Sequence, residues 1–423
     1  MKNYRSFFDR FNTPGLTQKV NAIFFDISKT KIYGGETMSL ASLVNNLVSR
    51  LVYQHGSLPF SFVVHTVEGV SIPIGDELPA FEVYIRNKAG VKAIKSLNEL
   101  KIAEAYIKGD LDVEGNLIKA LHFQDVFLNR NIWLKKWRDI AISLCRREKC
   151  NPNWIAKHYD SDNAQLLVLD YDYHLYTQGI YVNDEDNLEA GAERKLESAF
   201  QALNLKPNDS LLDVGCGWGG FLRYVASRGI HVTGITLSHN QKQYTEELIR
   251  KNHFDAKLMY QDCFSFQPSQ KYDAIAMMGV MEHLFDYSRA IKQVSKWIKP
   301  GGRIYLDFAS AKAHFDTSVF ITKYIWPGTF RMVFMPLFID AVRESPFEII
   351  SINNDRHNYY LWSKWVTERW EQKKIEVIEK YGEEIWRIFR ILYAGTASIM
   401  DRPSHNATAY RVVLEYPVDF VQG

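Results

Sequence analysis

The chain has 423 residues, a hydrophobic content of 46% and a formal net charge of +2 at pH 7. This length is enough for two folded domains, and the apolar content excludes an intrinsically disordered chain. The charge gives no positive field over the whole molecule, so nucleic-acid binding is not expected, and four cysteines without a Cys-x-x-Cys pair argue against a metal (zinc) site or a disulfide framework.

The first eleven residues interrupt their aromatic side chains with charge and lack the apolar core of a signal peptide. No stretch of the sequence approaches the ~20 apolar residues that cross a bilayer. Together with cysteines typical of a reducing compartment, these features predict a cytoplasmic protein, so any lipid substrate would be reached from the inner face of the membrane.

Residues 1–150 are expected to form an N-terminal accessory domain and linker, a smaller α+β unit. Its apolar spacing predicts a helix over 39–53 and strands over 60–67, 70–74 and 81–86.

Two charged segments of this domain carry alternatives. The acidic run of Asp110, Asp112 and Glu114 does not reproduce the spacing of an EF-hand loop, so a tight turn between helices is expected there rather than a calcium site. The mixed basic and aromatic residues over 133–138 fit either an interfacial membrane helix or a solvated helix that joins two domains.

The glycine-rich segment 211–220, LLDVGCGWGG, is the most informative stretch of the chain. It predicts a buried strand that turns sharply at Gly215, Gly217 and Gly219 into a helix over 221–227. The spacing Gly215, Gly217, Gly220 also satisfies the dinucleotide fingerprint, so the glycines alone do not separate a nicotinamide enzyme from an S-adenosylmethionine-dependent methyltransferase.

Four further strands are predicted over 231–241, 256–260, 272–279 and 303–308, with a turn over 299–302 before the last. The second strand ends in hydroxyls and an amide, whereas a dinucleotide site needs an acid about 20 residues after the glycines. The alternation of strands and helices predicts a parallel sheet with helices on both faces and ligands at the carboxyl ends of its strands, where Glu282 and Asp307 fall.

Several motifs in the same order resemble the cyclopropane-fatty-acid synthase and mycolic acid cyclopropane synthase family of class I methyltransferases. The matching motifs lie at 158–160, 186–189, 212–220, 234–241, 279–283 and 323–328. The resemblance implies a Rossmann-like methyltransferase domain over 151–423 with C-terminal helical lipid-binding elements, and S-adenosylmethionine as cofactor. It also implies that residues 1–150 shape the substrate entrance or a homodimer contact.

The resemblance also assigns the cofactor-binding residues. They are Tyr176, Thr177, Asp213, Gly215, Gly217, Gly219, Thr236, Leu237, Ser238, Gln241, Asp262 and Cys263. The nearby Cys216 is expected to pack rather than react, and His174 and His283 are expected to be structural or surface residues.

The implied acceptor is a double bond in an unsaturated fatty acyl chain of a membrane phospholipid. Methyl transfer creates a carbocation, and loss of a proton from the new methyl group closes a cyclopropane ring. In the family a bicarbonate ion held by a cysteine, a glutamate, a histidine and a tyrosine serves this step. The glutamate is retained as Glu282, whereas Gln178, Asp307 and His357 stand at the other positions, with Tyr359 close to the last.

These changes leave the use of bicarbonate open, because the pair of Glu282 with Asp307 would repel an anion. One hypothesis is that Asp307 orients His357, which takes the proton directly. The alternatives are a methyltransferase that adds a methyl branch or modifies another hydrophobic acceptor, a catalytically impaired lipid-binding homologue, and a nicotinamide oxidoreductase. The tryptophans at 362, 365, 370 and 386 fit an acyl tunnel or ordinary helix packing.

Overall fold

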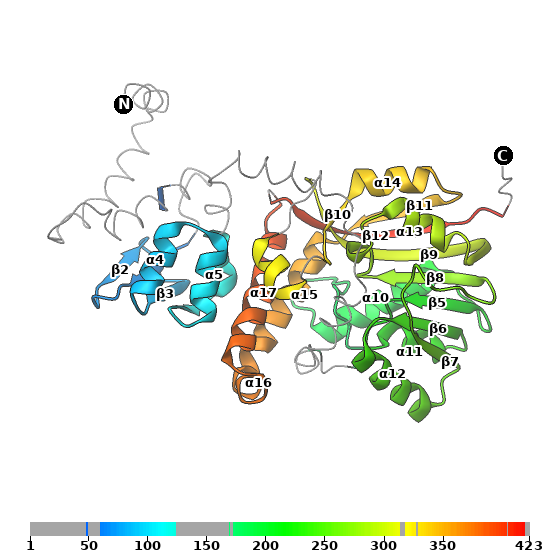
Figure 1. Ribbon diagram of the computed structural model, residues 1–423, viewed down its shortest axis with the longest axis horizontal. Helices are drawn as coiled ribbons and strands as arrows, with labels where there is room; N and C mark the ends of the chain where they lie inside the picture. The colour runs from blue at the N-terminus through cyan, green and yellow to red at the C-terminus, as the bar shows by residue number, and fades with distance from the viewer. Residues whose placement is uncertain are drawn as a thin grey trace, which may run out of the picture.

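The computed structural model describes residues 48–49, 60–123, 169, 172–313, 318–326, 329–403 and 405–418. Most of the helix predicted over 39–53, the basic and aromatic run at 133–138 and the motif at 158–160 lie outside these residues. Two parts are seen, a small N-terminal domain and a larger α/β domain, with the C-terminal helices between them (Figure 1).

The N-terminal domain is a four-stranded sheet covered by two helices. Its elements are β1 (Phe62–His65), β2 (Ser71–Ile74), β3 (Phe81–Ile85), α4 (Lys88–Ser96), α5 (Glu99–Ile107) and β4 (Leu111–Gly115), with strand order β2-β1-β3-β4. The three strands predicted over 60–86 are confirmed. Asn87 and Asn98 begin the two helices by accepting backbone hydrogen bonds at their N-termini.

The acidic run after α5 is a strand, so the predicted turn between helices is wrong there. Residues 111–115 form β4, which pairs antiparallel with β3. The acids alternate with Leu111 and Val113, and this two-residue period places the apolar side chains toward the sheet's core while Glu114 is exposed. The acidic side chains that suggested a loop lie on the face of the strand opposite to Leu111 and Val113.

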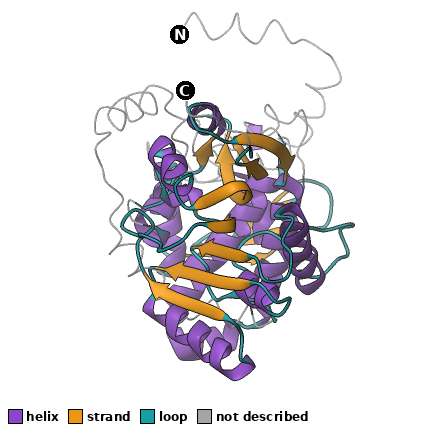
Figure 2. Cartoon of the chain, turned by 90° about the vertical axis from the view of Figure 1, so that its right-hand side faces the viewer, coloured by secondary structure: helices purple, strands orange, loops and turns teal. Residues whose placement is uncertain are grey.

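The larger domain is built on a twisted sheet whose described strands follow the order β11-β12-β9-β8-β5-β6-β7, with β10 paired to β9 (Figure 2). The strands from β9 to β7 are parallel, whereas β12 runs antiparallel to both β9 and β11. Their bounds are β5 Ser210–Val214, β6 His231–Thr236, β7 Ala256–Tyr260, β8 Tyr272–Met278, β9 Ile298–Ala311, β10 Val333–Phe334, β11 Glu348–Asn354 and β12 Ala407–Glu415. The predicted parallel sheet is confirmed.

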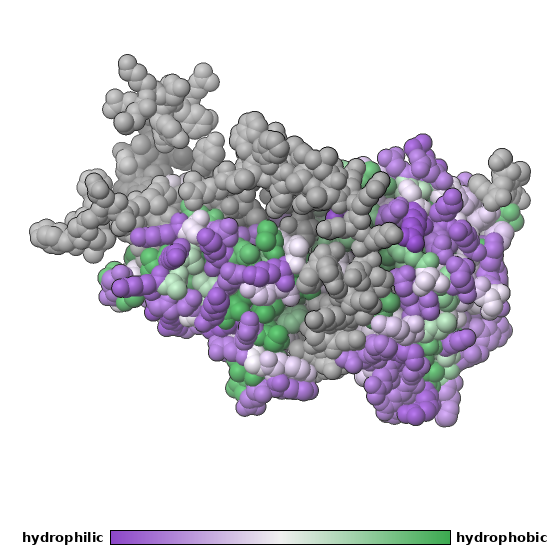
Figure 3. Space-filling model, viewed as in Figure 1, coloured by the Kyte–Doolittle hydropathy of each residue, from purple (hydrophilic) through white to green (hydrophobic). Residues whose placement is uncertain are grey.

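Helices pack on both faces of this sheet, as expected for a Rossmann-like fold. One apolar core joins α10 (Leu188–Ala202) and α11 (Gly220–Ala226) with the C-terminal helices. The other joins α13 (Tyr287–Val294) and α14 (Met335–Arg343). The amphipathic α12 (His239–Asn252) lies beside β6 and β7, and hydrophilic residues cover it on the face shown in Figure 3.

Strand β9 is longer than predicted, and this changes the place of Asp307. The strand begins at Ile298, passes through the predicted turn at 299–302, where Gly301 has a φ of +80°, and continues to Ala311. Asp307 therefore lies inside β9, level with Met278 at the end of β8. Cross-strand pairing with β12 holds the extra length, because Ala309 and Ala311 oppose residues of β12.

The C-terminal helices α15 (Arg356–Gln372), α16 (Lys374–Tyr381) and α17 (Glu383–Asp401) stand between the two parts of the molecule (Figure 1). Trp362, Trp370 and Trp386 are buried in the apolar core, which supports helix packing rather than a tunnel for these side chains. No helix among the described residues is both long and apolar enough to cross a membrane.

Two buried arginines of α17 fasten the N-terminal domain to these helices. Arg390 donates to the hydroxyl of Tyr106 at 2.6 Å and to the carbonyl of Val113 at 2.9 Å, and it pairs with Glu371. Arg387 donates to the carbonyl of Tyr106 at 3.0 Å. Buried guanidinium groups with several partners fix the contact between the domains, and apolar side chains gather around the same region in Figure 3.

Candidate active site

The glycine-rich turn leaves the sheet at the end of β5 and enters α11. Gly215, Gly217 and Gly219 have φ values of +69°, +53° and +76°, a region that costs other residues about 1–2 kcal/mol. A Cβ on Gly215 would lie 2.6 Å from Val280, and one on Gly219 would lie 2.5 Å from Thr245, whereas one on Gly217 would meet no atom within 4 Å. Gly217 therefore faces open space, where a ligand can approach the backbone.

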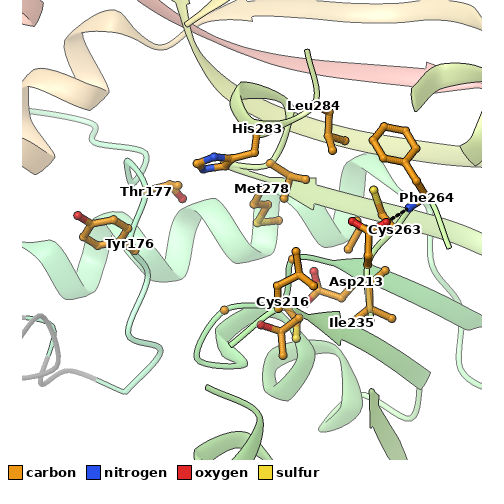
Figure 4. A pocket seen from close by; sticks show the side chains of 18 of the residues that line it. Tyr176, Thr177, Asp213, Cys216, Ile235, Cys263, Phe264, Met278, His283 and Leu284 are labelled. Atoms are coloured by element: carbon orange, nitrogen blue, oxygen red, sulfur yellow. Dashed lines mark hydrogen bonds between the residues drawn. The ribbon is translucent and has the colours of Figure 1, made fainter. Parts of the chain in front are cut away.

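A cavity of about 1100 Å³ opens beside this turn at the carboxyl ends of the strands. Tyr176 and Thr177 lie on one side of it, and Asp213 and Cys263 lie on the other (Figure 4). All the predicted cofactor residues line the cavity except Gly219 and Ser238. Those that line it are Tyr176, Thr177, Asp213, Gly215, Gly217, Thr236, Leu237, Gln241, Asp262 and Cys263.

The two predicted residues that do not line the cavity shape its walls. Gly219 is the residue before α11, with a left-handed backbone. Ser238 is fully buried and begins α12 by accepting from the backbone N–H of Gln241 at 3.2 Å. The hydroxyl of Thr236 donates to the Gln241 side chain at 2.8 Å, so the end of β6 and the start of α12 are held together.

The carboxylate of Asp213 is buried, and its Oδ2 has no hydrogen-bond partner among the described residues. Burial raises the pKa of Asp213 to about 7, because the charged form is poorly solvated. Hydrogen-bond donors or a positive charge in the cavity would supply the missing partner. S-adenosylmethionine carries both, so this carboxylate and the open face of Gly217 fit the predicted cofactor.

His283 also lines the cavity, and sequence reasoning did not place it there. Its ring is buried and its Nδ1 lies 2.6 Å from the carbonyl of Thr329, so this nitrogen carries the proton and donates. Burial lowers the pKa of His283 to about 4, and the imidazole is neutral at pH 7. The hydrogen bond to Thr329 gives His283 the structural role that was expected for it. His174, which was expected to have a similar role, also lines the cavity.

Glu282 lies directly behind the cavity wall. It belongs to the short helix η5 (Met281–His283) that follows β8. Its Oε1 accepts from the backbone N–H of Ala309 at 2.7 Å, and its Oε2 has no partner among the described residues. Burial raises the pKa of Glu282 to about 8. The predicted catalytic carboxyl is therefore buried, incompletely paired and one residue from the cavity-lining His283.

The predicted pairing of Asp307 with His357 is wrong. Asp307 is fully buried, and its Oδ2 lies 2.7 Å from the Nζ of Lys195 on α10. His357 has a side chain 60% exposed, and its Nε2 lies 2.8 Å from Asp184. The two residues are held by different partners in different environments, since Asp307 is buried within β9 whereas His357 lies in the first turn of α15 at the surface.

Sequence reasoning missed Lys195 altogether. Its side chain is fully buried and also donates to the hydroxyl of Thr177 on the cavity wall. Burial raises the pKa of Asp307 and Lys195 opposes this by its charge. The expected repulsive pair of Glu282 with Asp307 is thus compensated by a cation.

Gln178 is buried next to a second ion pair. Its side-chain N–H donates to Asp355 Oδ2 at 3.3 Å, and the same oxygen lies 2.6 Å from the guanidinium of Arg411. Asn358 donates to the other oxygen of Asp355 at 2.8 Å. Asp307 interacts electrostatically with both Asp355 and Glu282, so Gln178, Glu282 and Asp307 occupy one buried polar region, and the exposed His357 lies outside it.

Comparison with known proteins places this site in a family. The family described as mycolic acid cyclopropane synthetase matches residues 146–408. A sphingolipid C9-methyltransferase of Komagataella phaffii is 26% identical over 340 residues, covering 74% of this chain and 68% of that protein. The cyclopropane-fatty-acyl-phospholipid synthase of Escherichia coli is 29% identical over 246 residues, 56% of this chain and 62% of its own length.

A solved structure shares the fold. It is a mycolic acid cyclopropane synthase complexed with SAH and CTAB, with a TM-score of 0.57 and 19% identity, covering 62% of this chain and 98% of that one. This likeness in fold, together with the sheet order and the helices on both faces, confirms the Rossmann-like architecture expected from the sequence.

Proposed function

The chain belongs to the mycolic acid cyclopropane synthetase family and is an S-adenosylmethionine-dependent methyltransferase, and we propose that it methylates a double-bond carbon in an unsaturated acyl chain of a membrane lipid. S-adenosylmethionine, when bound, supplies an electrophilic methyl group. The residues of the chain then have to hold both reactants in line and exclude water. Because the acceptor resides in a bilayer, the protein would act at the membrane surface.

The buried carboxyl of Glu282 carries this proposal. Methylation of an alkene leaves positive charge on the acyl chain, and a proton must then be lost from a carbon atom. In its ionised form, a carboxyl group in a dry site, with an oxygen unpaired and a pKa of about 8, stabilises such a charge and is a stronger proton acceptor than an exposed glutamate. Methyl transfer to oxygen or nitrogen does not require this group, since the proton there is acidic.

The carbon that loses the proton decides the product. Loss from the new methyl group closes a cyclopropane ring, the reaction of the E. coli relative's name. Loss from a neighbouring chain carbon leaves a methyl branch, and this second function is favoured by the sphingolipid C9-methyltransferases among the relatives. Ring closure is the function we put first, because Glu282 is the family residue that this chain retains for it.

Labelled cofactor distinguishes the two products. The full chain is incubated with vesicles of unsaturated phospholipid or unsaturated sphingolipid and with S-adenosylmethionine bearing a trideuterated methyl group. Mass spectrometry of a cyclopropane finds that one deuterium has been lost, whereas a methyl branch retains all of them. Glu282→Gln should bind the cofactor and form neither product. Absence of a methylated lipid in either vesicle, with cofactor binding intact, would contradict the proposal and support a lipid-binding homologue.

A further inference from the structure

Lys195 is a charged side chain inside the apolar face of a helix. Within α10 it shares the buried face with Leu188, Ala192 and Ala199, and its exposure is zero. A buried ammonium group costs several kcal/mol unless it is paired and hydrogen-bonded. Here it is paired with Asp307 at 2.7 Å and bonded to Thr177. The lysine and the aspartate form one unit, because removing either leaves a buried charge alone.

This ion pair lies immediately behind the wall of the cavity. Thr177 lines the cavity and contacts Lys195, while the backbone N–H of Gly279, another lining residue, donates to the carbonyl of Asp307 at 3.0 Å. The wall is closely packed at this point, since a Cβ on Gly279 would lie 2.7 Å from Thr177. A change in the pair would therefore be transmitted to the cavity through a single layer of atoms.

The charges around Asp307 leave Lys195 as its own counter-ion. Asp355 adds negative potential at Asp307, Glu282 does so when it is ionised, and Tyr305 and Arg411 also face the region. Arg411 lies 2.6 Å from Asp355 and is matched by that carboxylate. Among the described residues, the oxygens Oε2 of Glu282 and Oδ1 of Asp307 have no hydrogen-bond partner.

A bicarbonate ion does not fit this arrangement. The family members that the sequence resembles hold it with a cysteine, a histidine and a tyrosine besides the glutamate, and Gln178 and Asp307 stand at two of these positions. An added anion would meet the Asp307 carboxylate, and Lys195, the cation that contacts it among the described residues, is already paired with it. Two like charges about 4 Å apart repel by about 4 kcal/mol at an effective dielectric constant of 20.

We propose that Lys195 is a positioning residue that keeps the Asp307 carboxylate charged and fixed, so that this chain carries a built-in anion and turns over without bicarbonate. The inference rests on the proposed methylation of an alkene. In this arrangement Asp307, which is paired with Lys195, remains anionic, and Glu282 takes up and releases the proton. Burial raises the pKa of both carboxyl groups, and the ammonium group of Lys195, 2.7 Å from Asp307, opposes this rise at Asp307 by contact.

The first experiment compares turnover of the wild-type chain in CO₂-free buffer with and without added bicarbonate. The two rates should agree within about twofold, and a stimulation of about tenfold or more would overturn the inference. The proposed function is judged separately, because it fails only if the wild-type chain forms no methylated lipid under either condition.

The second experiment opens a place for an external anion. Asp307→Ala should lower turnover by about 100-fold, and added formate or bicarbonate should restore at least about tenfold by pairing with Lys195. The matched control is Lys195→Met combined with Asp307→Ala, which lacks the cation and should show no restoration. Restoration of the double variant, or none in Asp307→Ala with the fold intact by circular dichroism, would refute the role of Lys195.

A pH profile separates positioning from a purely structural role. Lys195→Met leaves Asp307 without its cation. Asp307 should then ionise at a higher pH, and the pH profile of turnover should shift upward with it. Lys195→Arg should keep the wild-type profile. If Lys195→Met does not fold, Lys195→Gln and Asp307→Asn provide the same comparison with polar side chains. A profile unchanged in an active Lys195→Met or Lys195→Gln chain would contradict the proposal.

Discussion

Replacement of Glu282 by glutamine should make the protein more stable and inactive at once. Glutamine keeps the shape of the side chain and the oxygen that accepts from Ala309 at 2.7 Å, but it cannot ionise. In the wild-type protein, burial raises the pKa of Glu282 from 4.5 to about 8. The folded protein therefore retains a proton at pH values where the unfolded chain has lost it.

The magnitude follows from this difference in proton binding. Between about pH 4.5 and pH 8 the folded state binds more protons than the unfolded state, so the free energy of unfolding falls by about 1.4 kcal/mol for each pH unit. At pH 7 the penalty is about 3 kcal/mol, and above pH 8 it reaches about 4–5 kcal/mol. Glu282→Gln lacks this penalty and should be more stable by these amounts.

Urea denaturation of the cofactor-free protein at intervals from pH 5 to pH 9 measures the effect. The difference between variant and wild type should be small at pH 5 and grow toward pH 8. Glu379→Gln, at an exposed position of α16, is the matched control and should change stability by less than about 0.5 kcal/mol at every pH. A difference that does not grow with pH would refute the burial of an ionisable Glu282, and retained turnover would refute its catalytic role.

Three further predictions, two of them with a control variant, test the remaining geometry. Arg390→Met should lower the free energy of unfolding by about 3–5 kcal/mol, because its buried partners lose their hydrogen bonds. The control, Arg343→Met at an exposed position, should change it by less than about 0.5 kcal/mol in the same urea titration. Equal effects of the two substitutions would contradict the buried contact. Gly217→Ala should cost about 1–2 kcal/mol of backbone strain and weaken cofactor binding by calorimetry, while Gly219→Ala should lose more stability through its contact with Thr245; undiminished binding by Gly217→Ala would place the ligand elsewhere. His357→Ala should leave turnover within about twofold of wild type, since its partner is a surface aspartate, and a large loss would revive the direct role of this histidine.

The parallel part of the sheet was accessible from sequence because each strand is a short apolar run that ends in a glycine or a polar turn. The segments 256–260 and 272–279 illustrate this, since the structure places strands there with nearly the same bounds. The full length of β9 was not accessible, because its last residues are held by β12, almost 100 residues later. The alternation of acids in β4 was visible, but charge was given more weight than the two-residue period.

Within the site, the cofactor residues could be predicted from the sequence, whereas the partners of Asp307 and His357 could not. The cofactor residues follow directly after strands, so their positions in the sequence fix their positions at the sheet edge. The partners of Asp307 and His357 come from distant elements, α10 and the segment before it, and no local pattern identifies them. One signal did exist for Lys195: it follows Leu188 and Ala192 and precedes Ala199 at the helical spacing of a buried face.

The N-terminal domain touches the catalytic part at a second place besides α17, and this links it to the cavity. On α5, Glu99 accepts from Ser318 and Glu104 accepts from Lys323 and Tyr324. The same segment contains Trp326, whose ring lies edge-on to His283 with the centroids 6.0 Å apart. A ligand that orders this histidine would also stabilise the contact of α5 with the larger domain. By thermodynamic reciprocity, a more stable contact would raise the affinity for the ligand. The N-terminal domain, whose described residues do not line the cavity, would in this way influence affinity there.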